Sequence, residues 1–122
     1  MKMTNFEIYM TAKNLLEAFT DSNQYLPIKL NFFILKNKNI LIQLAQDIDN
    51  ARIQVIHNYG TLDEESGYYN IPEDQIQSAN QELNDLFAIE QEIDIKKLNI
   101  NDFPDDINLT TGQMNALMFM IE

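Results

Sequence analysis

The sequence predicts one α+β domain, residues 1–122, that is mainly helical: a long antiparallel helical hairpin with N- and C-terminal helices and a small β element. Three observations lead to this prediction. Apolar residues recur at helical spacing along most of the chain. The 122 residues include three glycines and three prolines, so loops should be few and short. One turn-rich segment separates the two longest helical patterns. A chain of this length can bury a core without disulfides, and it contains no cysteine.

The first predicted helix begins after Thr4 or Asn5, either of which is a good N-terminal cap. Glu7 then falls in the first turn, where a carboxylate suits the positive end of the helix dipole. The apolar residues recur at steps of three and four and form one stripe that we expect to be buried: Ile8, Ala12, Leu15, Leu16 and Phe19. The helix should end in the segment Thr20-Asp21-Ser22-Asn23.

The second predicted helix is the longest element and runs from Pro27 to Asn58-Tyr59-Gly60. With about 30 residues it would be about 45 Å long. Gly60 is expected to stop it in the left-handed conformation. Its seam alternates steps of four and three, as in a coiled coil: Leu30, Ile34, Asn37, Leu41, Leu44, Ile48, Ala51 and Val55. The polar Asn37 on this seam either fixes register or oligomeric state, or faces water near a helix end.

A small β-hairpin is predicted after the second helix. The β-prone segments Gly60-Thr61-Leu62 and Tyr68-Tyr69-Asn70-Ile71 flank the turn-rich pentapeptide Asp63-Glu64-Glu65-Ser66-Gly67. A third helix then starts with Pro72-Glu73-Asp74 as an acidic first turn and should return antiparallel along the second. Its stripe consists of Ile76, Ala79 or Asn80, Leu83, Leu86, Phe87 and Glu90.

The C-terminal part is predicted to hold the second β piece and the last helix. Glu92-Ile93-Asp94-Ile95-Lys96 alternates polar and apolar residues, as a half-buried strand does, and Ile107-Asn108-Leu109 is the expected partner. Thr110-Thr111-Gly112-Gln113 has the spelling of a capping box. The helix that follows should place four residues on one face: Met114, Leu117, Met118 and Ile121.

Charge is divided unevenly along the chain. Residues 1–58 contain six Lys or Arg and five Asp or Glu, whereas residues 59–122 contain two and fourteen, which gives the net charge of −11. Such an acidic surface repels phosphate backbones and lipid headgroups and attracts basic partners over about one Debye length, ~8–10 Å. We therefore expect neither direct nucleic-acid binding nor membrane binding. The start of the chain has no apolar run of signal-peptide length, so we expect a soluble cytosolic protein.

Catalytic and cofactor signatures are missing from the sequence. The single histidine, His57, falls near the end of the second helix, where a structural role is ordinary. The three serines lack a nucleophile-elbow context, and the glycines are too scattered to cradle a phosphate. The acidic turn lacks the ligand order of an EF-hand loop. We therefore expect no enzyme, no cofactor and no metal, with an adventitious cation and a carboxylate metal hydrolase as remote alternatives.

Two sets of side chains are candidates for contact with a partner. The first combines the acidic turn with the aromatic residues after it: Asp63, Glu64, Glu65, Tyr68 and Tyr69. The second is a series of carboxylates that could imitate a phosphate strand: Glu73, Asp74, Asp94, Asp102, Asp105 and Asp106. Methionine is also enriched at interfaces, which makes three residues of the last helix further candidates: Met114, Met118 and Met120. The alternative for these methionines and for both tyrosines is a place in the core.

Four segments resemble a family of small phage and prophage proteins: Leu26-Pro27-Ile28-Lys29, then Asn58 to Gly67, then Glu82-Leu83-Asn84-Asp85-Leu86, and finally Leu109-Thr110, Gln113 to Leu117 and Ile121-Glu122. Members share a "YG-x-x-D-E-x-G" turn between two helices, a "N-x-E-L-x-E-L" helix and an apolar C-terminus ending in "IE". The resemblance covers most of the chain. It implies a phage or prophage origin and expression in a bacterial cytoplasm, and the family has no established function and no catalytic residues to transfer.

Two functional hypotheses follow from these observations. The leading one is a non-enzymatic phage protein that acts by protein–protein contact, as a virion or assembly component, located in the host cytoplasm and then in the particle. The alternative is a phage inhibitor of a host defence system, similar to an anti-CRISPR protein, that acts as an acidic nucleic-acid mimic. The sequence leaves the partner and the oligomeric state open.

Overall fold

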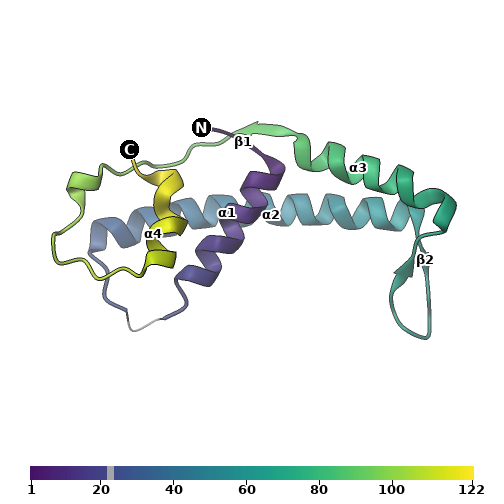
Figure 1. The fold of residues 1–122 in the computed structure, drawn as a ribbon, viewed down its shortest axis with the longest axis horizontal. Coiled ribbons are helices and arrows are strands. Elements are labelled where there is room, and N and C mark those ends of the chain that lie inside the picture. Colours follow the sequence, from purple (N-terminus) through teal and green to yellow (C-terminus); the bar gives the residue numbers. More distant parts are fainter. Residues whose placement is uncertain (22–23) are drawn as a thin grey trace.

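The α+β, mainly helical fold is confirmed by the computed structural model, which describes residues 1–21 and 24–122. Figure 1 shows the arrangement. The helices and strands, in chain order, are β1 (Lys2–Thr4), α1 (Asn5–Ala18), α2 (Ile28–Tyr59), β2 (Thr61–Leu62), β3 (Tyr69–Asn70), α3 (Ile76–Ala88), β4 (Glu90–Glu92) and α4 (Thr111–Leu117). Single 3₁₀ turns lie at Glu73–Gln75, Ile100–Asp102 and Met118–Met120. The predicted end of the first helix is only partly testable, because Ser22 and Asn23 lie outside the described residues.

Helix α2 is the spine of the molecule. It contains 32 residues, in agreement with the predicted long helix, and Pro27 is its N-cap. Figure 1 shows α1 crossing the middle of α2, α4 on the side of its N-terminal half, and α3 running back along its C-terminal half. Since α3 has 13 residues, the antiparallel helical hairpin occupies only that half of the spine.

The hydrophobic core lies on one side of the α1 crossing. Its fully buried side chains come from α1, α2 and the C-terminal helix with its 3₁₀ extension: Ile8, Leu15, Leu41, Leu117 and Met120. Along α2 the core ends at Ile48. Residues 49–88, which we call the arm, extend beyond it, except that Phe87 at the inner end of α3 packs against the core. Of the residues of the arm, all of which the structure describes, Ala79 alone is buried. The molecule is therefore a packed lobe with a thin two-helix arm.

Both predicted N-terminal caps are confirmed. Thr4 Oγ1 accepts a hydrogen bond from the Glu7 backbone N–H, and Glu7 Oε1 accepts one from the Thr4 N–H, which forms a complete capping box. The hydrogen bond from the Thr4 backbone lowers the pKa of the Glu7 carboxyl. Thr110 and Gln113 form the same reciprocal pair at the start of α4. Each cap satisfies two backbone N–H groups that a helix leaves free.

The prediction for the second β piece is wrong in two respects. The strand is β4, Glu90–Glu92, and its antiparallel partner is β1 at the N-terminus, with Lys2 opposite Glu92. The alternation in Glu92 to Lys96 arises because Ile93 and Ile95 insert into the core while Asp94 faces water. The expected partner at Ile107 is an irregular loop whose apolar side chains pack against the core.

The predicted hairpin is confirmed, but one of its glycines differs from expectation. Strands β2 and β3 pair antiparallel, with Thr61 opposite Asn70. Gly67 has a positive φ of 74° in the turn, a conformation that favours glycine. Gly60 is extended, with φ −102° and ψ 161°, and not left-handed. It is needed because the backbone approaches closely there: a Cβ on Gly60 would lie 2.8 Å from the Ile56 carbonyl oxygen.

Gly60→Ala should destabilise the protein by about 1–3 kcal/mol, because an overpacked contact with backbone cannot relax by rotating a side chain. Gly112→Ala is the matched control: a Cβ there meets nothing closer than Thr110 Oγ1 at 3.9 Å, inside α4. Alanine is the better helix former by about 1 kcal/mol, so the control should be neutral or stabilising. Urea denaturation measures both, and equal effects would contradict the steric explanation.

Candidate functional site

The acidic turn forms the outer end of the arm, where the hairpin projects away from α2 and α3 (Figure 1). Its backbone is held by internal hydrogen bonds: the Asp63 N–H donates to the Tyr68 carbonyl and the Gly67 N–H to the Asp63 carbonyl, both at 2.8 Å. The Asp63 carboxylate also accepts from the Glu65 N–H at 3.0 Å. The Tyr68 side chain is 76% exposed. The turn therefore presents its charges and one aromatic ring from an ordered loop.

Tyr69 has a different role from its neighbour. Its ring stacks on the His57 imidazole with the centroids 4.3 Å apart and an interplanar angle of 25°. His57 lies in the last turn of α2, as predicted from its position in the sequence. The stacked pair fixes the base of the hairpin to the end of the spine, so Tyr69 positions the hairpin and Tyr68 remains free for contact.

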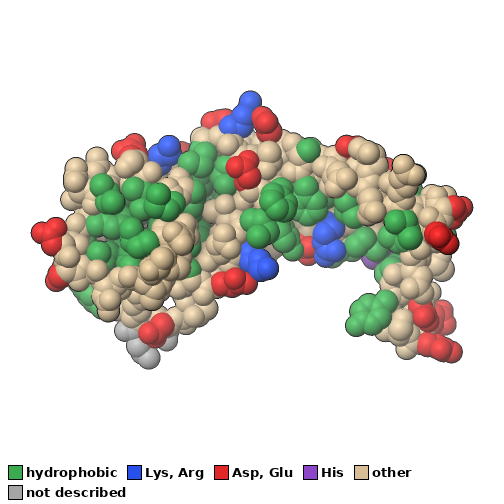
Figure 2. Space-filling view, viewed as in Figure 1, with side chains coloured by type: hydrophobic (Ala, Val, Ile, Leu, Met, Phe, Trp, Pro, Cys, Tyr) green, Lys and Arg blue, Asp and Glu red, His purple; other side chains and the backbone are tan. Residues whose placement is uncertain are grey.

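Carboxylates gather at this end of the arm, as Figure 2 shows. We call Asp63, Glu64, Glu65, Glu73 and Asp74 the acidic tip. Glu73 and Asp74 belong to the 3₁₀ turn that follows β3. Within residues 1–21 and 24–122, none of the five forms a salt bridge. Their combined field is therefore uncompensated locally and favours a basic partner.

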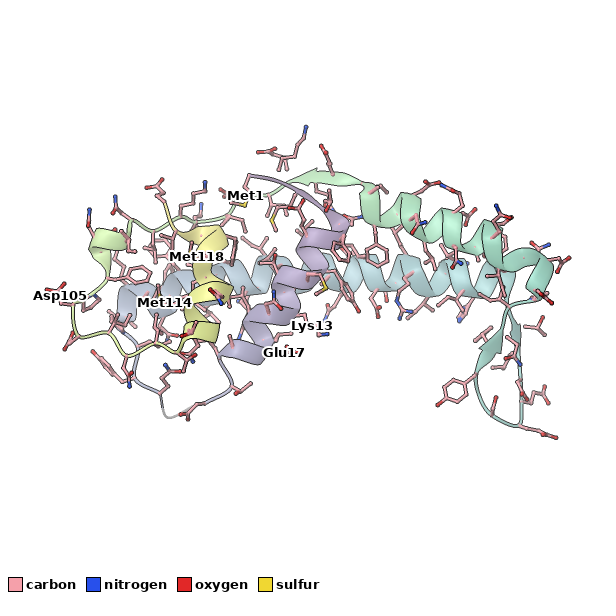
Figure 3. All side chains as sticks on the ribbon, viewed as in Figure 1. Met1, Lys13, Glu17, Asp105, Met114 and Met118 are labelled. Carbon is pink, nitrogen blue, oxygen red and sulfur yellow. The ribbon has the colours of Figure 1, made fainter. Side chains whose placement is uncertain are left out.

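The remaining predicted site residues lie elsewhere. Asp94 forms a salt bridge with Lys96 at 2.9 Å, and the hydrogen bond from this ammonium group lowers the pKa of Asp94. Asp102 pairs with Lys29 at 3.5 Å. Figure 3 places Asp105 at the end of the molecule opposite the arm, and Asp106 follows it in the same exposed loop. The structure thus brings Glu73 and Asp74 to the hairpin and leaves the other four carboxylates away from it.

The two helices of the arm are joined by a polar contact near its outer end. The Tyr59 hydroxyl donates a hydrogen bond to Glu82 Oε1 at 3.1 Å. This bond raises the pKa of Tyr59, since a phenolate would lose the donated proton and face a carboxylate. The bond is solvent-exposed, so it links the two helices beside the apolar contacts of α3 with α2.

A groove that the sequence did not reveal lies where α1 crosses α2. It has a volume of about 490 Å³ and a largely apolar lining from α1 and α2: Tyr9, Ala12, Leu16, Ile42 and Ala45, with Lys13, Glu17, Gln46, Asp49 and Asn50 at its edges. Leu16, predicted to be buried, is 48% exposed because it lines this groove. In Figure 2 the underside of the arm, between the lobe and the hairpin, is concave. The spacing of the first helix puts Leu16 on the predicted buried stripe beside Leu15, so this pattern gives no sign of the groove.

The three methionines of the last helix differ in burial. Met120 is fully buried and belongs to the core, Met114 is half-buried, and Met118 is exposed. Figure 3 shows Met114 and Met118 on α4 and its extension. The predicted common face of the last helix therefore divides between core and surface.

Asn37 is the most informative polar residue of the core. It is fully buried, and its side-chain amide donates to the Lys96 carbonyl and accepts from the Lys96 N–H, each at 2.8 Å. It therefore neither faces water nor pairs with a second chain through these atoms. Asn5 and Gln113 are buried amides of the same kind: Asn5 donates to the Leu86 carbonyl and Gln113 to the Ala18 carbonyl. All three hold segments that are distant in sequence.

In residues 1–21 and 24–122, no three acidic or histidine side chains lie close enough together to hold a metal ion. None of the described helices is both long and apolar enough to cross a bilayer. Comparison of the chain with protein-family models, with curated proteins and with solved structures gave no match.

Proposed function

We propose that this is a non-enzymatic phage or prophage protein that works by protein–protein contact in the host cytoplasm, as a component of the virion or of its assembly. The phage origin rests on the sequence resemblance, although the turn here has one more residue before Gly67 than the family pattern. The contact is assigned to the acidic tip and Tyr68. The observation that carries it is the arm itself, which extends past the core and ends in an ordered, uncompensated cluster of carboxylates.

The side chains of the tip are expected to contribute more to the free energy of binding than to the free energy of folding. Tyr68 contributes little to stability at 76% exposure, yet tyrosine is among the residues that most often dominate binding energy at interfaces. The five carboxylates around it steer a basic partner toward the tip and accelerate encounter. The alternative function, nucleic-acid mimicry against a host nuclease, would have to rely on the tip and on Asp105 and Asp106 at the opposite end of the molecule, because Asp94 and Asp102 pair with lysines.

Photo-crosslinking in infected bacteria tests the proposal. A photoreactive phenylalanine analogue at position 68 should crosslink to a phage structural or assembly protein. The same analogue at Tyr25 is the matched control, since that side chain is 85% exposed and lies in the loop before α2, far along the spine from the hairpin. Equal crosslinking at both positions would contradict a contact through the tip. A host nuclease as the product at position 68 would favour the inhibitor instead.

A further inference from the structure

We infer that the groove between α1 and α2, together with the adjoining face of the arm, binds an amphipathic α-helix of a protein partner, with the basic end of that helix against the acidic tip. This inference deepens the proposed function and rests on it, because it names the kind of element that the partner contributes. It is carried by three features: an apolar groove, a continuous helix face and a one-sided distribution of charge.

The face of α2 that lines the groove continues beyond it as far as the hairpin. Ile42, Gln46, Asp49, Ile53 and His57 follow one another at steps of four, three, four and four, which keeps them on the same side of a helix. Gln46, Ile53 and His57 are exposed, so this face is not covered by α1 or α3. From Ile42 to His57 it measures about 22 Å at about 1.5 Å per residue. A partner helix of about four turns matches that length.

The walls of this surface favour a helix as the occupant. On one side α1 presents Ala12 and Leu16, and at the far end the hairpin rises from the His57–Tyr69 pair. The hollow is open below, as Figure 2 shows. An amphipathic helix places apolar anchors every three or four residues. On α2, Ile42 and Ala45 are three residues apart in the groove, and Ile53 adds an apolar side chain eight residues further along.

Charge fixes the direction of the occupant. At the α1 end, Lys13 and Glu17 carry opposite charges at the groove edge (Figure 3), and Asp49 pairs with Arg52 at 2.9 Å. At the hairpin end, Asp63, Glu64 and the rest of the acidic tip are uncompensated. The partner helix should therefore carry either no charge or charges of both signs at the end that lies in the α1 groove. Its other end, at the hairpin, should be basic. A second copy of this chain is a poor occupant, because each carries a net charge of −11.

Two synthetic peptides test the inference. Both contain about 16 residues with leucine at helical spacing and the same number of lysines, which are clustered at one end in the first and spread evenly in the second. Fluorescence anisotropy should show tighter binding of the first, and the preference should fall as salt rises. Amide shifts of the ¹⁵N-labelled protein should map to Ala12, Ile42 and Ile53. No saturable shift at about 1 mM peptide would overturn the inference.

Matched variants identify the surface. Leu16→Asp should weaken the first peptide at least about ten-fold, because it places a charge in the apolar groove. Leu35→Asp is the control: Leu35 is also 48% exposed but lies in a different hollow of the lobe. Glu64→Lys should remove the advantage of clustered lysines, whereas Asp105→Lys, with the same change in net charge, should not. Equal effects within either pair would overturn the inference.

The result is separable from that of the crosslinking experiment. If the peptides fail to bind but position 68 still crosslinks to a phage protein, the helix-binding groove is wrong and the contact function stands. If the peptides bind and position 68 crosslinks to nothing, the groove is a real site while the tip contact is wrong. A concentration-dependent dimer in sedimentation that Leu16→Asp abolishes would assign the groove to a second copy and overturn the inference.

Discussion

Replacing Asn37 by leucine is expected to destabilise the protein by about 3 kcal/mol. The leucine side chain fits the apolar surroundings but makes neither of the hydrogen bonds to Lys96, so the part-buried N–H and carbonyl of Lys96 lose their partner. Each such loss costs about 1–3 kcal/mol. The melting temperature should fall by about 10 °C, measured by circular dichroism with urea denaturation as a second probe.

Asn39→Leu is the control for this prediction. Asn39 lies two residues after Asn37 on the same helix, and its side chain is exposed. It should change the free energy of unfolding by less than about 0.5 kcal/mol. If Asn37→Leu were as mild as its control, the backbone of Lys96 would not depend on this amide. The seam would then be an apolar packing surface at which the polar residue serves no structural purpose.

The fold elements that sequence predicted well are those whose signals are local. Thr4 and Thr110 each stand three residues before the partner that completes the cap, and Gly67 stands within the turn that needs it. The pairing of β1 with β4 was missed because it joins residues about ninety positions apart. Strands of three residues carry no pattern strong enough to identify such a partner.

The seam of α2 shows why a pattern of spacing does not fix the packing. Its steps of four and three continue unchanged from Leu30 to Val55, yet the core covers it only as far as Ile48. How many elements cover a stripe depends on the path of the other helices, and in the arm α3 is the helix that packs along α2. Asn37 stood out as a polar seam residue, but its partner lies 59 positions away.

The candidate site was predicted in part. The hairpin and its acidic turn were found because turn residues and β-prone residues adjoin in sequence. The series of six carboxylates was defined by composition alone, and the structure leaves Asp94, Asp102, Asp105 and Asp106 away from the hairpin. The groove was missed because Leu16 and Ile42 line it from two helices, and neither helix shows it by itself.

Shortening Leu41 and shortening Leu83 should have effects that differ in size and in reach. Leu41 is fully buried in the lobe, so Leu41→Ala should cost about 3 kcal/mol, within the range for buried leucines, and lower protection from amide exchange throughout the lobe. Leu83 is half-buried in the arm, where the core cluster does not extend. Leu83→Ala should therefore cost less, about 1 kcal/mol. Hydrogen exchange followed by mass spectrometry measures both the size and the location.

In the unaltered protein, the same measurement should find α3 and residues 51–59 exchanging through local opening, well before residues 30–48 of the same helix. The reason is that opening the arm exposes few buried side chains, since Ala79 alone is buried there. In the Leu83→Ala variant, amide hydrogen exchange should accelerate in the arm and stay unchanged in the lobe. Uniform protection along α2, or acceleration in the lobe on changing Leu83, would mean that arm and lobe unfold as one unit. A tip carried by an arm that opens independently can adjust to a partner without loss of the core.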